Sequence, residues 1–267
     1  MSATIHSTAI VDPAAQLGAD VSVGPFSIIT GPVRIGAGSK IGPHCHLIGP
    51  MTLGEKNDVG TGVVLGERPQ HLSADGSGAD LVIGSGNCFR EYVTIHRGSA
   101  VGKVTTVGNN NYLMANSHVG HDSRVGNNCI FANSALLGGH THIGDKVFLS
   151  GNAAVHQFVR LGRLAFVSGC SVATMDVPPF VIIQNINQVC GVNVVGMKRA
   201  GFKTDEISAV RQTYRMLYLQ GNLISVALEN IVAQLGHFEA VIEFVEFVRT
   251  SIRGVSTFCG RSGKRAA

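Results

Sequence analysis

The stretch LMANSHVGHDSRVGNNCIFANSALLGGHTHIGDKVF, residues 113–148, repeats with a period of six. Its large apolar residues stand at every sixth position: Leu113, Val119, Val125, Phe131, Leu137 and Ile143. This period matches neither the 3.6-residue repeat of an amphipathic helix nor the two-residue alternation of a half-buried strand. It is typical of a parallel β-helix, in which each hexad makes one short strand and a turn. Three hexads then close one triangular coil of 18 residues.

The same phase extends over most of the chain. It runs through residues 5–65, is lost over 66–80, and returns unshifted through residues 83–173, Val101 included. We expect all these apolar residues to fill the interior of the coils, and the small residues four positions later to fit the corners. Glycine often follows the apolar residue, and we interpret it as tolerating the conformation of the turn. The polar stretch 66–80 is predicted to be a loop extruded from one corner, and a long loop on a rigid scaffold is often functional.

The hexads stop near residue 175, and a proline pair in DVPPFVII (176–183) follows. The sequence therefore predicts two domains, a β-helix over residues 1–183 and a small α-helical domain over 184–267. Thr204 is the expected N-cap of an amphipathic helix. Two more amphipathic segments follow, at about 222–235 and 237–252.

Composition narrows the function classes. Only 14% of the residues are charged, and the net charge of +4 contains no dense Lys/Arg block, so we expect no nucleic-acid partner. No leader pattern and no apolar span of about 20 residues is present, so we expect neither export nor an integral membrane segment. The six cysteines include no Cys-x-x-Cys pair and are predicted to be reduced, in the cytoplasm. The flat faces of a β-helix favour an oligomer.

Histidines gather in the middle of the repeat. Residues 18 apart stack in this geometry, so Asp122 and His140 are predicted to lie in one column, with His121 pointing outward beside them. His118 is expected on the preceding edge, and His156 on a coil further along. A histidine held by a carboxylate suits general-base chemistry. Three histidines at coil spacing also suit zinc with one open position. The spacing alone does not decide between a general base and a zinc site. A third hypothesis is that these histidines are solvated surface residues.

Five segments carry a resemblance to a known family: REYVTIHRGS, SHVGHDSRVGNNC, AVHQFVRLG, SGCSVATMDVPPFVI and GVNVVGMKRAGF. Together with the N-terminal hexads they resemble the acyl-[acyl-carrier-protein]–UDP-N-acetylglucosamine O-acyltransferases, a hexapeptide-repeat acyltransferase family. The resemblance implies a left-handed β-helix, a homotrimer with active sites between neighbouring prisms, and neither metal nor other cofactor. It implies transfer of a 3-hydroxyacyl chain from acyl carrier protein to the 3-hydroxyl of UDP-N-acetylglucosamine, the first step of lipid A biosynthesis.

The resemblance also implies roles for individual residues. His121 matches the general base, Asp122 the residue that orients it, and the backbone amide of Gly139 an oxyanion donor. Gly169 matches a small residue that leaves room for a long acyl tail. The residues expected to bind substrate are His71, His96, Arg97, His118, His140, His156, Gln157, Gly169, Asn193 and Arg199.

The chain departs from the family pattern near the acceptor. His71 stands where an aspartate is usual, Val195 replaces a glutamate and Ala200 an arginine, and QNINQVCG (184–191) is one residue short. These departures keep a second function open, a paralogous acyltransferase that uses a UDP amino sugar and makes an amide. A zinc β-helix enzyme of the carbonic anhydrase kind is the third, less favoured hypothesis.

Overall fold

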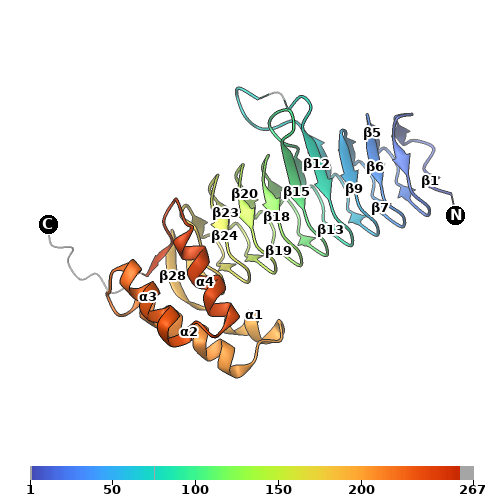
Figure 1. Ribbon diagram of the computed structural model, residues 1–267. Coiled ribbons are helices and arrows are strands. Elements are labelled where there is room, and N and C mark those ends of the chain that lie inside the picture. Colours follow the sequence, from blue (N-terminus) through green and yellow to red (C-terminus); the bar gives the residue numbers. More distant parts are fainter. Residues whose placement is uncertain (1, 75, 259–267) are drawn as a thin grey trace.

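The computed structural model describes residues 2–74 and 76–258, and it confirms a left-handed parallel β-helix followed by a small helical domain (Figure 1). The coils form three sheets, here named A, B and C. Sheet A contains β1 (Thr4–Ile5), β4 (Ser22–Val23), β7 (Lys40–Ile41), β10 (Asp58–Val59), β13 (Cys88–Phe89), β16 (Tyr112–Leu113), β19 (Ile130–Phe131), β22 (Phe148–Leu149), β25 (Phe166–Val167), β27 (Val181–Gln184), β28 (Gln188–Val192) and β29 (Thr257–Phe258).

Sheet B contains β2 (Ile10–Val11), β5 (Ile28–Thr30), β8 (His46–Ile48), β11 (Val64–Glu67), β14 (Thr94–His96), β17 (His118–Val119), β20 (Leu136–Leu137), β23 (Ala154–Val155) and β26 (Val172–Ala173). Sheet C contains β3 (Gln16–Leu17), β6 (Val33–Ile35), β9 (Met51–Leu53), β12 (Asp80–Ile83), β15 (Val104–Val107), β18 (Arg124–Val125), β21 (His142–Ile143) and β24 (Arg160–Leu161). The chain visits A, B and C in turn.

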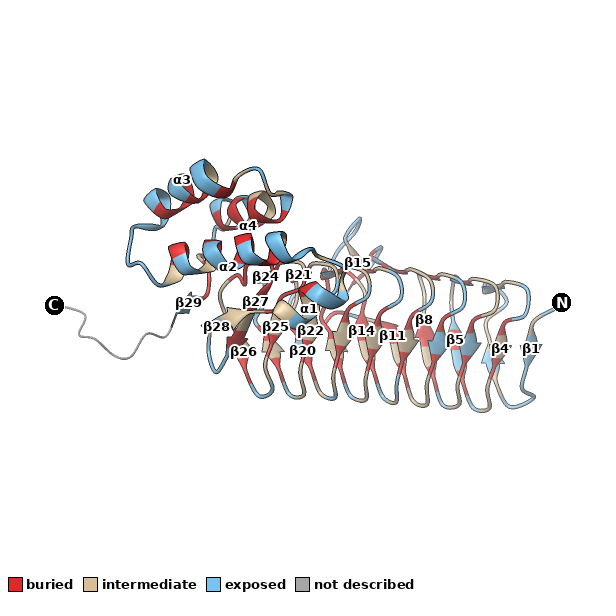
Figure 2. Cartoon of the chain, turned by 90° about the horizontal axis from the view of Figure 1, so that it is seen from below, coloured by how far each residue is buried: buried red, intermediate tan, exposed pale blue. Residues whose placement is uncertain are grey.

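The predicted stacking of residues 18 apart is confirmed. Val119 pairs with Leu137, and Leu137 with Val155, in a parallel register along sheet B. All three side chains are buried, so these hexads each place one aliphatic side chain in the interior. Figure 2 shows buried residues on the strands along the prism. Removal of this apolar surface from water is the main term that holds the coils together.

The glycines that follow the apolar residues have a different role from the one we expected. A Cβ on Gly120 would lie 2.7 Å from the carbonyl carbon of Gly138 in the next coil, so the glycine permits close stacking. The left-handed turn falls two residues later, at Asp122 with φ 60° and His140 with φ 59°. Asn, Asp and His adopt this conformation more readily than other residues that carry a Cβ. Asp122 and His140 therefore occupy positions at which the turn favours their residue types.

The prediction of a buried side chain was wrong for Ile5, which is 46% exposed on the first coil, where no earlier coil covers it. It was also wrong for Val101, because a second loop had gone unnoticed. Leu53 pairs with Ile83, and Ile83 with Val107, so these two coils take thirty and twenty-four residues instead of eighteen. The shorter insertion leaves Val101 80% exposed. An insertion of six residues preserves the phase of the hexads, so the periodicity of the sequence cannot reveal it. Both loops leave the prism between sheets B and C.

The C-terminal domain contains α1 (Val194–Arg199), α2 (Thr204–Tyr218), α3 (Ile224–Leu235) and α4 (Glu239–Arg249) (Figure 1). The predicted N-cap was one residue late. Lys203 is the N-cap of α2, and its N–H donates to the Glu206 carboxylate at 2.8 Å. The antiparallel hairpin of β27 and β28 joins the prism to α1. The predicted domain boundary falls inside this hairpin, and it stays a prediction.

An ion pair between Arg163 and Glu243 links the last coils to α4. Within the described residues, no helix is long and apolar enough to cross a bilayer. The five described cysteines are unpaired, and Cys259 lies outside the described residues.

Candidate active site

Most of the candidate residues lie along the corner where sheet B passes into sheet C. The turn after β17 carries His121 and Asp122, and the turn after β20 carries Gly139 and His140. The two inserted loops leave the same corner one and two coils earlier in the chain, after β11 and β14. The left-handed winding therefore gathers at one edge segments that are far apart in the sequence.

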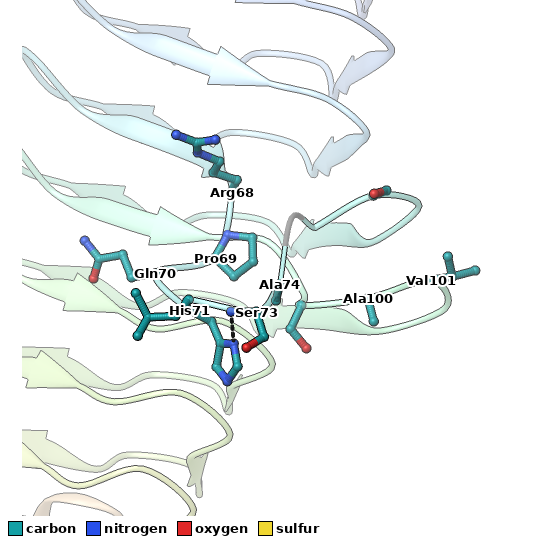
Figure 3. A pocket seen from close by; sticks show the side chains of 11 residues that line it. Arg68, Pro69, Gln70, His71, Ser73, Ala74, Ala100 and Val101 are labelled. Carbon is teal, nitrogen blue, oxygen red and sulfur yellow. Dashed lines mark hydrogen bonds between the residues drawn. The ribbon is translucent and has the colours of Figure 1, made fainter.

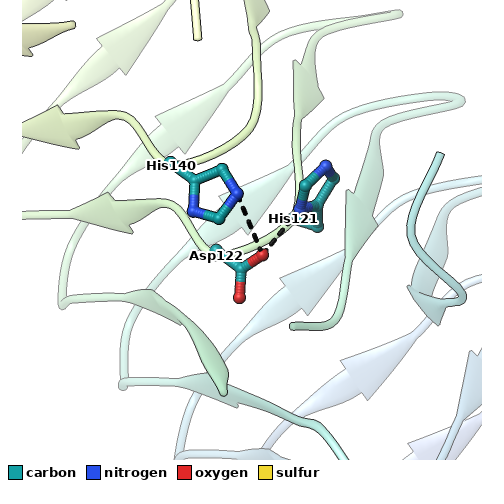
Figure 4. A group of neighbouring side chains, drawn as sticks. All are labelled: His121, Asp122 and His140. Atoms are coloured by element: carbon teal, nitrogen blue, oxygen red, sulfur yellow. Dashed lines mark hydrogen bonds and ion pairs between the residues drawn. The ribbon is translucent and has the colours of Figure 1, made fainter. Parts of the chain in front are cut away.

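Asp122 joins two imidazoles, as Figure 4 shows. Its Oδ2 lies 2.6 Å from Nδ1 of His121 and 3.5 Å from Nε2 of His140. His121 and Asp122 are buried, with 7% and 8% exposure. The predicted Asp122–His140 column and the position of His121 beside it are thus confirmed.

The environment of Asp122 keeps it ionised. Burial alone would raise the pKa of this carboxyl, but hydrogen bonds from His121 and from the N–H of Ser99 outweigh burial and hold the pKa below its ordinary value. The Asp122 N–H donates to Oγ1 of Thr105 at 2.8 Å, which fixes the turn. Because a carboxylate only accepts hydrogen bonds, Nδ1 of His121 carries the proton and Nε2 presents a lone pair.

Gly139 lies against the ring of His121. A Cβ on Gly139 would come within 2.8 Å of Nε2 of His121, so a larger residue would displace the imidazole. The N–H of Gly139 donates to no other group of the described chain. A lone pair on His121 and a backbone N–H without an acceptor among the described residues therefore belong to neighbouring residues.

His96 and His118 form a second pair beside the first. Their ring centroids are 5.2 Å apart, and Nδ1 of His96 lies 2.5 Å from the carbonyl oxygen of Arg68. Since a carbonyl cannot donate, His96 donates from Nδ1 and keeps Nε2 as an acceptor. Burial lowers the pKa of His96, and burial together with the neighbouring histidines lowers the pKa of His118 to about 4. Both rings are neutral near pH 7.

The extruded loop brings His71 to the site. Its ring lies edge-on to that of His121, with centroids 5.7 Å apart, and its Nδ1 accepts the N–H of Ser73 (Figure 3). A cavity of about 910 Å³ lies between this loop and the second loop, with Arg68 and Val101 in its walls. The two loops thus bound one open space, and His71 connects it to the ring of His121.

Other predicted residues lie further from His121. Arg97 lies at the base of the loop and donates from Nη1 to the Gly49 carbonyl at 2.8 Å. Gly169 is exposed in the turn between β25 and β26, at the corner of sheets A and B. His156 and Gln157 are exposed after β23, where Arg253 contacts His156.

Asn193 and Arg199 belong to a third corner. The Asn193 side chain caps α1 at Gly196 and donates to the carbonyl of Leu164, in the turn between sheets C and A. Its amide is therefore engaged within the chain. Arg199 is exposed at the end of the same short helix.

Sequence reasoning missed Phe158, whose ring stacks on His140 at 4.5 Å with an interplanar angle of 6°. Phe158 stands 18 residues after His140, so the column that identified Asp122 and His140 could have found it. Ser99 and Thr105 were also missed, because the second insertion was hidden.

The residues that could bind zinc in the structure differ from the three histidines that the zinc hypothesis predicts. His121, Asp122 and His140 offer one atom each, all within 4.8 Å of one another, which is two histidines and a carboxylate rather than three histidines. Lys103 and Arg124 line the cavity beside Asp122 and His140, and two cations disfavour a bound dication there.

Comparison with known proteins identifies close relatives. A family described as UDP N-acetylglucosamine O-acyltransferase, domain 2, matches residues 176–256, and the bacterial transferase hexapeptide family matches residues 14–49 and 105–139. An acyl-[acyl-carrier-protein]–UDP-N-acetylglucosamine O-acyltransferase of Cupriavidus metallidurans is 53% identical, over 94% of this chain and 98% of the relative. The one of Halorhodospira halophila is 45% identical over the same shares.

Solved structures agree. The UDP-N-acetylglucosamine acyltransferase of Francisella novicida superposes with a TM-score of 0.91 at 33% identity, covering 96% of this chain and 95% of that one. The enzyme of Campylobacter jejuni gives 0.90 at 30% identity, covering 96% and 100%.

Proposed function

Because this chain belongs to the acyl-[acyl-carrier-protein]–UDP-N-acetylglucosamine O-acyltransferases, it is an acyltransferase of lipid A biosynthesis, and we propose that His121 is its general base. The observation that supports this role is the short hydrogen bond from Nδ1 of His121 to Asp122, with Nε2 left free beside Gly139. The acyl group is a 3-hydroxyacyl chain on acyl carrier protein, and the acceptor is the sugar 3-hydroxyl.

In the proposed mechanism, Nε2 of His121 removes the proton of the sugar 3-hydroxyl as its oxygen attacks the thioester carbonyl. The N–H of Gly139 donates to the oxyanion that forms. The C–S bond then breaks, and the imidazolium returns its proton to the departing thiolate. Asp122 holds the imidazole in the required tautomer and stabilises its charged form.

His96, His118 and His140, whose pKa values are lowered, are proposed to bind the acceptor as neutral rings. Nε2 of His96 has a lone pair and suits a sugar hydroxyl, and His71 extends the same wall. A neutral ring beside the base does not compete with it for the proton.

The acyl tail is proposed to cross sheet B. It begins at the corner of His121 and ends beside Gly169 at the corner of sheets A and B, where the glycine leaves room. His156 and Gln157 lie at the end of β23, on the coil between, and flank its path.

The outer faces of the prism support a homotrimer. Towards the C-terminal coils, outward residues include Leu136 on sheet B and the stacked rings of Phe148 and Phe166 on sheet A. Sheet C carries Arg124, His142 and Arg160 at the same level. A ring in which sheet A of one subunit packs on sheet B of the next closes with threefold symmetry and leaves sheet C in water.

This arrangement completes the site. At the outer edge of each interface, the corner of His121 meets the neighbour's corner between sheets C and A, which carries Asn193 and Arg199. Arg199 is proposed to reach the nucleotide phosphate across this interface. Arg97 and Asn193 act by shaping the loop and α1. The proposal includes a cytoplasmic location, where the carrier protein and the nucleotide sugar are made.

A product assay tests the proposal. Purified protein receives a panel of 3-hydroxyacyl carrier proteins with UDP-N-acetylglucosamine or its 3-amino analogue as acceptor. We expect ester with the first acceptor, and a loss of about 10²–10⁴-fold in His121→Ala. Asp122→Ala should lose less, because the base remains but is no longer oriented.

If only the 3-amino analogue gave a product, the protein would form an amide by the same mechanism, and the second hypothesis would hold. Undiminished turnover in His121→Ala, with the fold intact by circular dichroism, would remove His121 from the role of base.

A further inference from the structure

After α4 the chain returns across the end of the prism as residues 251–256, here named the C-terminal strap. The strap is fixed to the buried Asp176. Backbone N–H groups link Asp176 to Gly254 at 3.0 Å and Ser256 to Asp176 at 2.8 Å, and Oγ of Ser251 donates to the Asp176 carboxylate at 2.9 Å. The strap is therefore held in place against the last coils.

The strap carries a cation without a carboxylate partner. Asp176 is already paired with Arg160, whose Nε lies 2.9 Å from its Oδ2. Arg253 donates from Nε to the Thr174 carbonyl at 3.0 Å and from Nη2 to Nδ1 of His156 at 3.2 Å. Across residues 2–74 and 76–258, no carboxylate oxygen lies within 4.0 Å of Arg253.

Arg253 lines a cavity that begins at the catalytic corner. This cavity has a volume of about 510 Å³, with His140 in one wall and Ile252 and Arg253 on the strap in another. The His140 ring is 5.0 Å from that of His121. Ile252 is fully exposed and Phe158 is 52% exposed, so the cavity combines apolar surface with one uncompensated charge.

The contact with His156 is replaceable. Nδ1 of His156 also lies 3.1 Å from the carbonyl oxygen of Gln157. Arg253 always donates, so its contact requires an unprotonated Nδ1, whereas the Gln157 carbonyl requires a protonated one. The two hydrogen bonds exclude each other. If Nη2 of Arg253 turns to another acceptor while Nε stays on the Thr174 carbonyl, His156 changes tautomer and donates to Gln157, so its Nδ1 keeps a partner.

We propose that this cavity binds a phosphate-bearing part of a substrate, with Arg253 as its phosphate contact. The inference rests on the proposed acyl transfer, in which both substrates carry phosphate. UDP-N-acetylglucosamine has a diphosphate, and acyl carrier protein bears its thioester on a phosphopantetheine arm. The apolar surface of Phe158 and Ile252 favours the arm, whose chain of methylenes and amides must approach His121 with its phosphate some distance behind.

The test compares Arg253→Gln and Arg253→Lys with Arg249→Gln. Arg249 is a matched control, since it is a partly exposed arginine on α4 paired with Glu246, and it does not line the cavity. We expect Arg253→Gln to raise KM for the acyl carrier protein about 10-fold or more, the size of a hydrogen bond to a charged group, with little change in kcat. Arg253→Lys should fall between, and the control should match the wild type.

Direct binding separates this inference from the acyl-transfer proposal. Calorimetry compares 4′-phosphopantetheine with pantetheine, and UDP with uridine, on wild type and Arg253→Gln, and it needs no turnover. The phosphate should strengthen binding of one pair in the wild type, and the variant should lose that gain. A gain confined to UDP would assign the cavity to the nucleotide. Equal phosphate gains in both proteins, with unchanged KM values and melting temperature, would overturn the role of Arg253.

Discussion

Folding lowers the pKa of His118, so its ring is harder to protonate in the folded protein than in the unfolded chain. Burial, with help from His96 and His121, lowers its pKa from 6.5 to about 4. Between these values the unfolded chain binds a proton that the folded protein does not, so stability rises with pH over this range. Above pH 6.5 the ring is neutral in both states and the effect ends. Such a ring stays neutral near pH 7, as its proposed contact with a sugar hydroxyl requires.

This linkage predicts a pH-dependent difference between wild type and His118→Asn. On lowering the pH from 7 to 5, wild type should lose about 2 kcal/mol more stability than the variant, since one pKa unit corresponds to about 1.4 kcal/mol. Denaturant unfolding at equal protein concentration measures both. The other histidines are common to the two proteins, so their contributions cancel. Parallel losses would mean that His118 titrates normally in the folded state.

At the scale of the element, the coil depends on how closely its neighbours stack. Gly36, after β6, has no room for a Cβ, which would lie 2.5 Å from the Gly54 carbonyl carbon and 2.6 Å from the Glu55 nitrogen. Both atoms are backbone, so the coils must separate to admit a methyl group.

Gly36→Ala should therefore destabilise the protein by at least about 1–3 kcal/mol. Gly191→Ala is the control, because nothing lies within 4 Å of a Cβ there and its φ is not positive. Differential scanning calorimetry should show a lower melting temperature for the first variant only. Gly36 lies far along the prism from His121, so the kcat of Gly36→Ala at low temperature should equal that of wild type.

The extruded loop has its own test. His71 stands where the family usually has an aspartate, and its ring lies edge-on to His121. If this position contacts the sugar, His71→Asp should lower KM for UDP-N-acetylglucosamine with little effect on KM for acyl carrier protein. His46→Asp, on an early coil, controls for the added charge. An unchanged acceptor KM in His71→Asp would dissociate this residue from the sugar.

The sequence predicted the coils well but not the second loop. Every sixth apolar residue defined the coils, and a separation of 18 was enough to pair Asp122 with His140. The same arithmetic could not reveal the second loop, because its six residues leave Val101 in phase while placing it in solvent. Nor could it show that Ser99 reaches Asp122, since that contact depends on where the hidden loop folds. The family resemblance, not the spacing, selected the base over the metal.

At the scale of the whole molecule, the chemistry of the three faces governs assembly. Leu136 on sheet B is 45% exposed and Val82 on sheet C is 42% exposed. The two side chains have nearly the same exposure but lie on different faces of the prism. In the proposed trimer only Leu136 is covered by a neighbour.

Leu136→Glu should therefore dissociate the trimer, because an unpaired carboxylate would be buried in the interface. Val82→Glu should leave assembly unchanged. Light scattering coupled to size-exclusion chromatography gives the mass of each. Equal masses for the two variants would contradict the assignment of sheet B to the interface.

The two insertions share a property that bears on how such proteins diversify. Each adds a whole number of hexads, so every strand that follows keeps its face and its neighbours, much as a gene keeps its reading frame when bases are gained in threes. An insertion or deletion of whole hexads at this corner therefore does not alter strand pairing in the rest of the prism. The loops beside the candidate active site can gain or lose single hexads while the coils that carry His121 keep their structure.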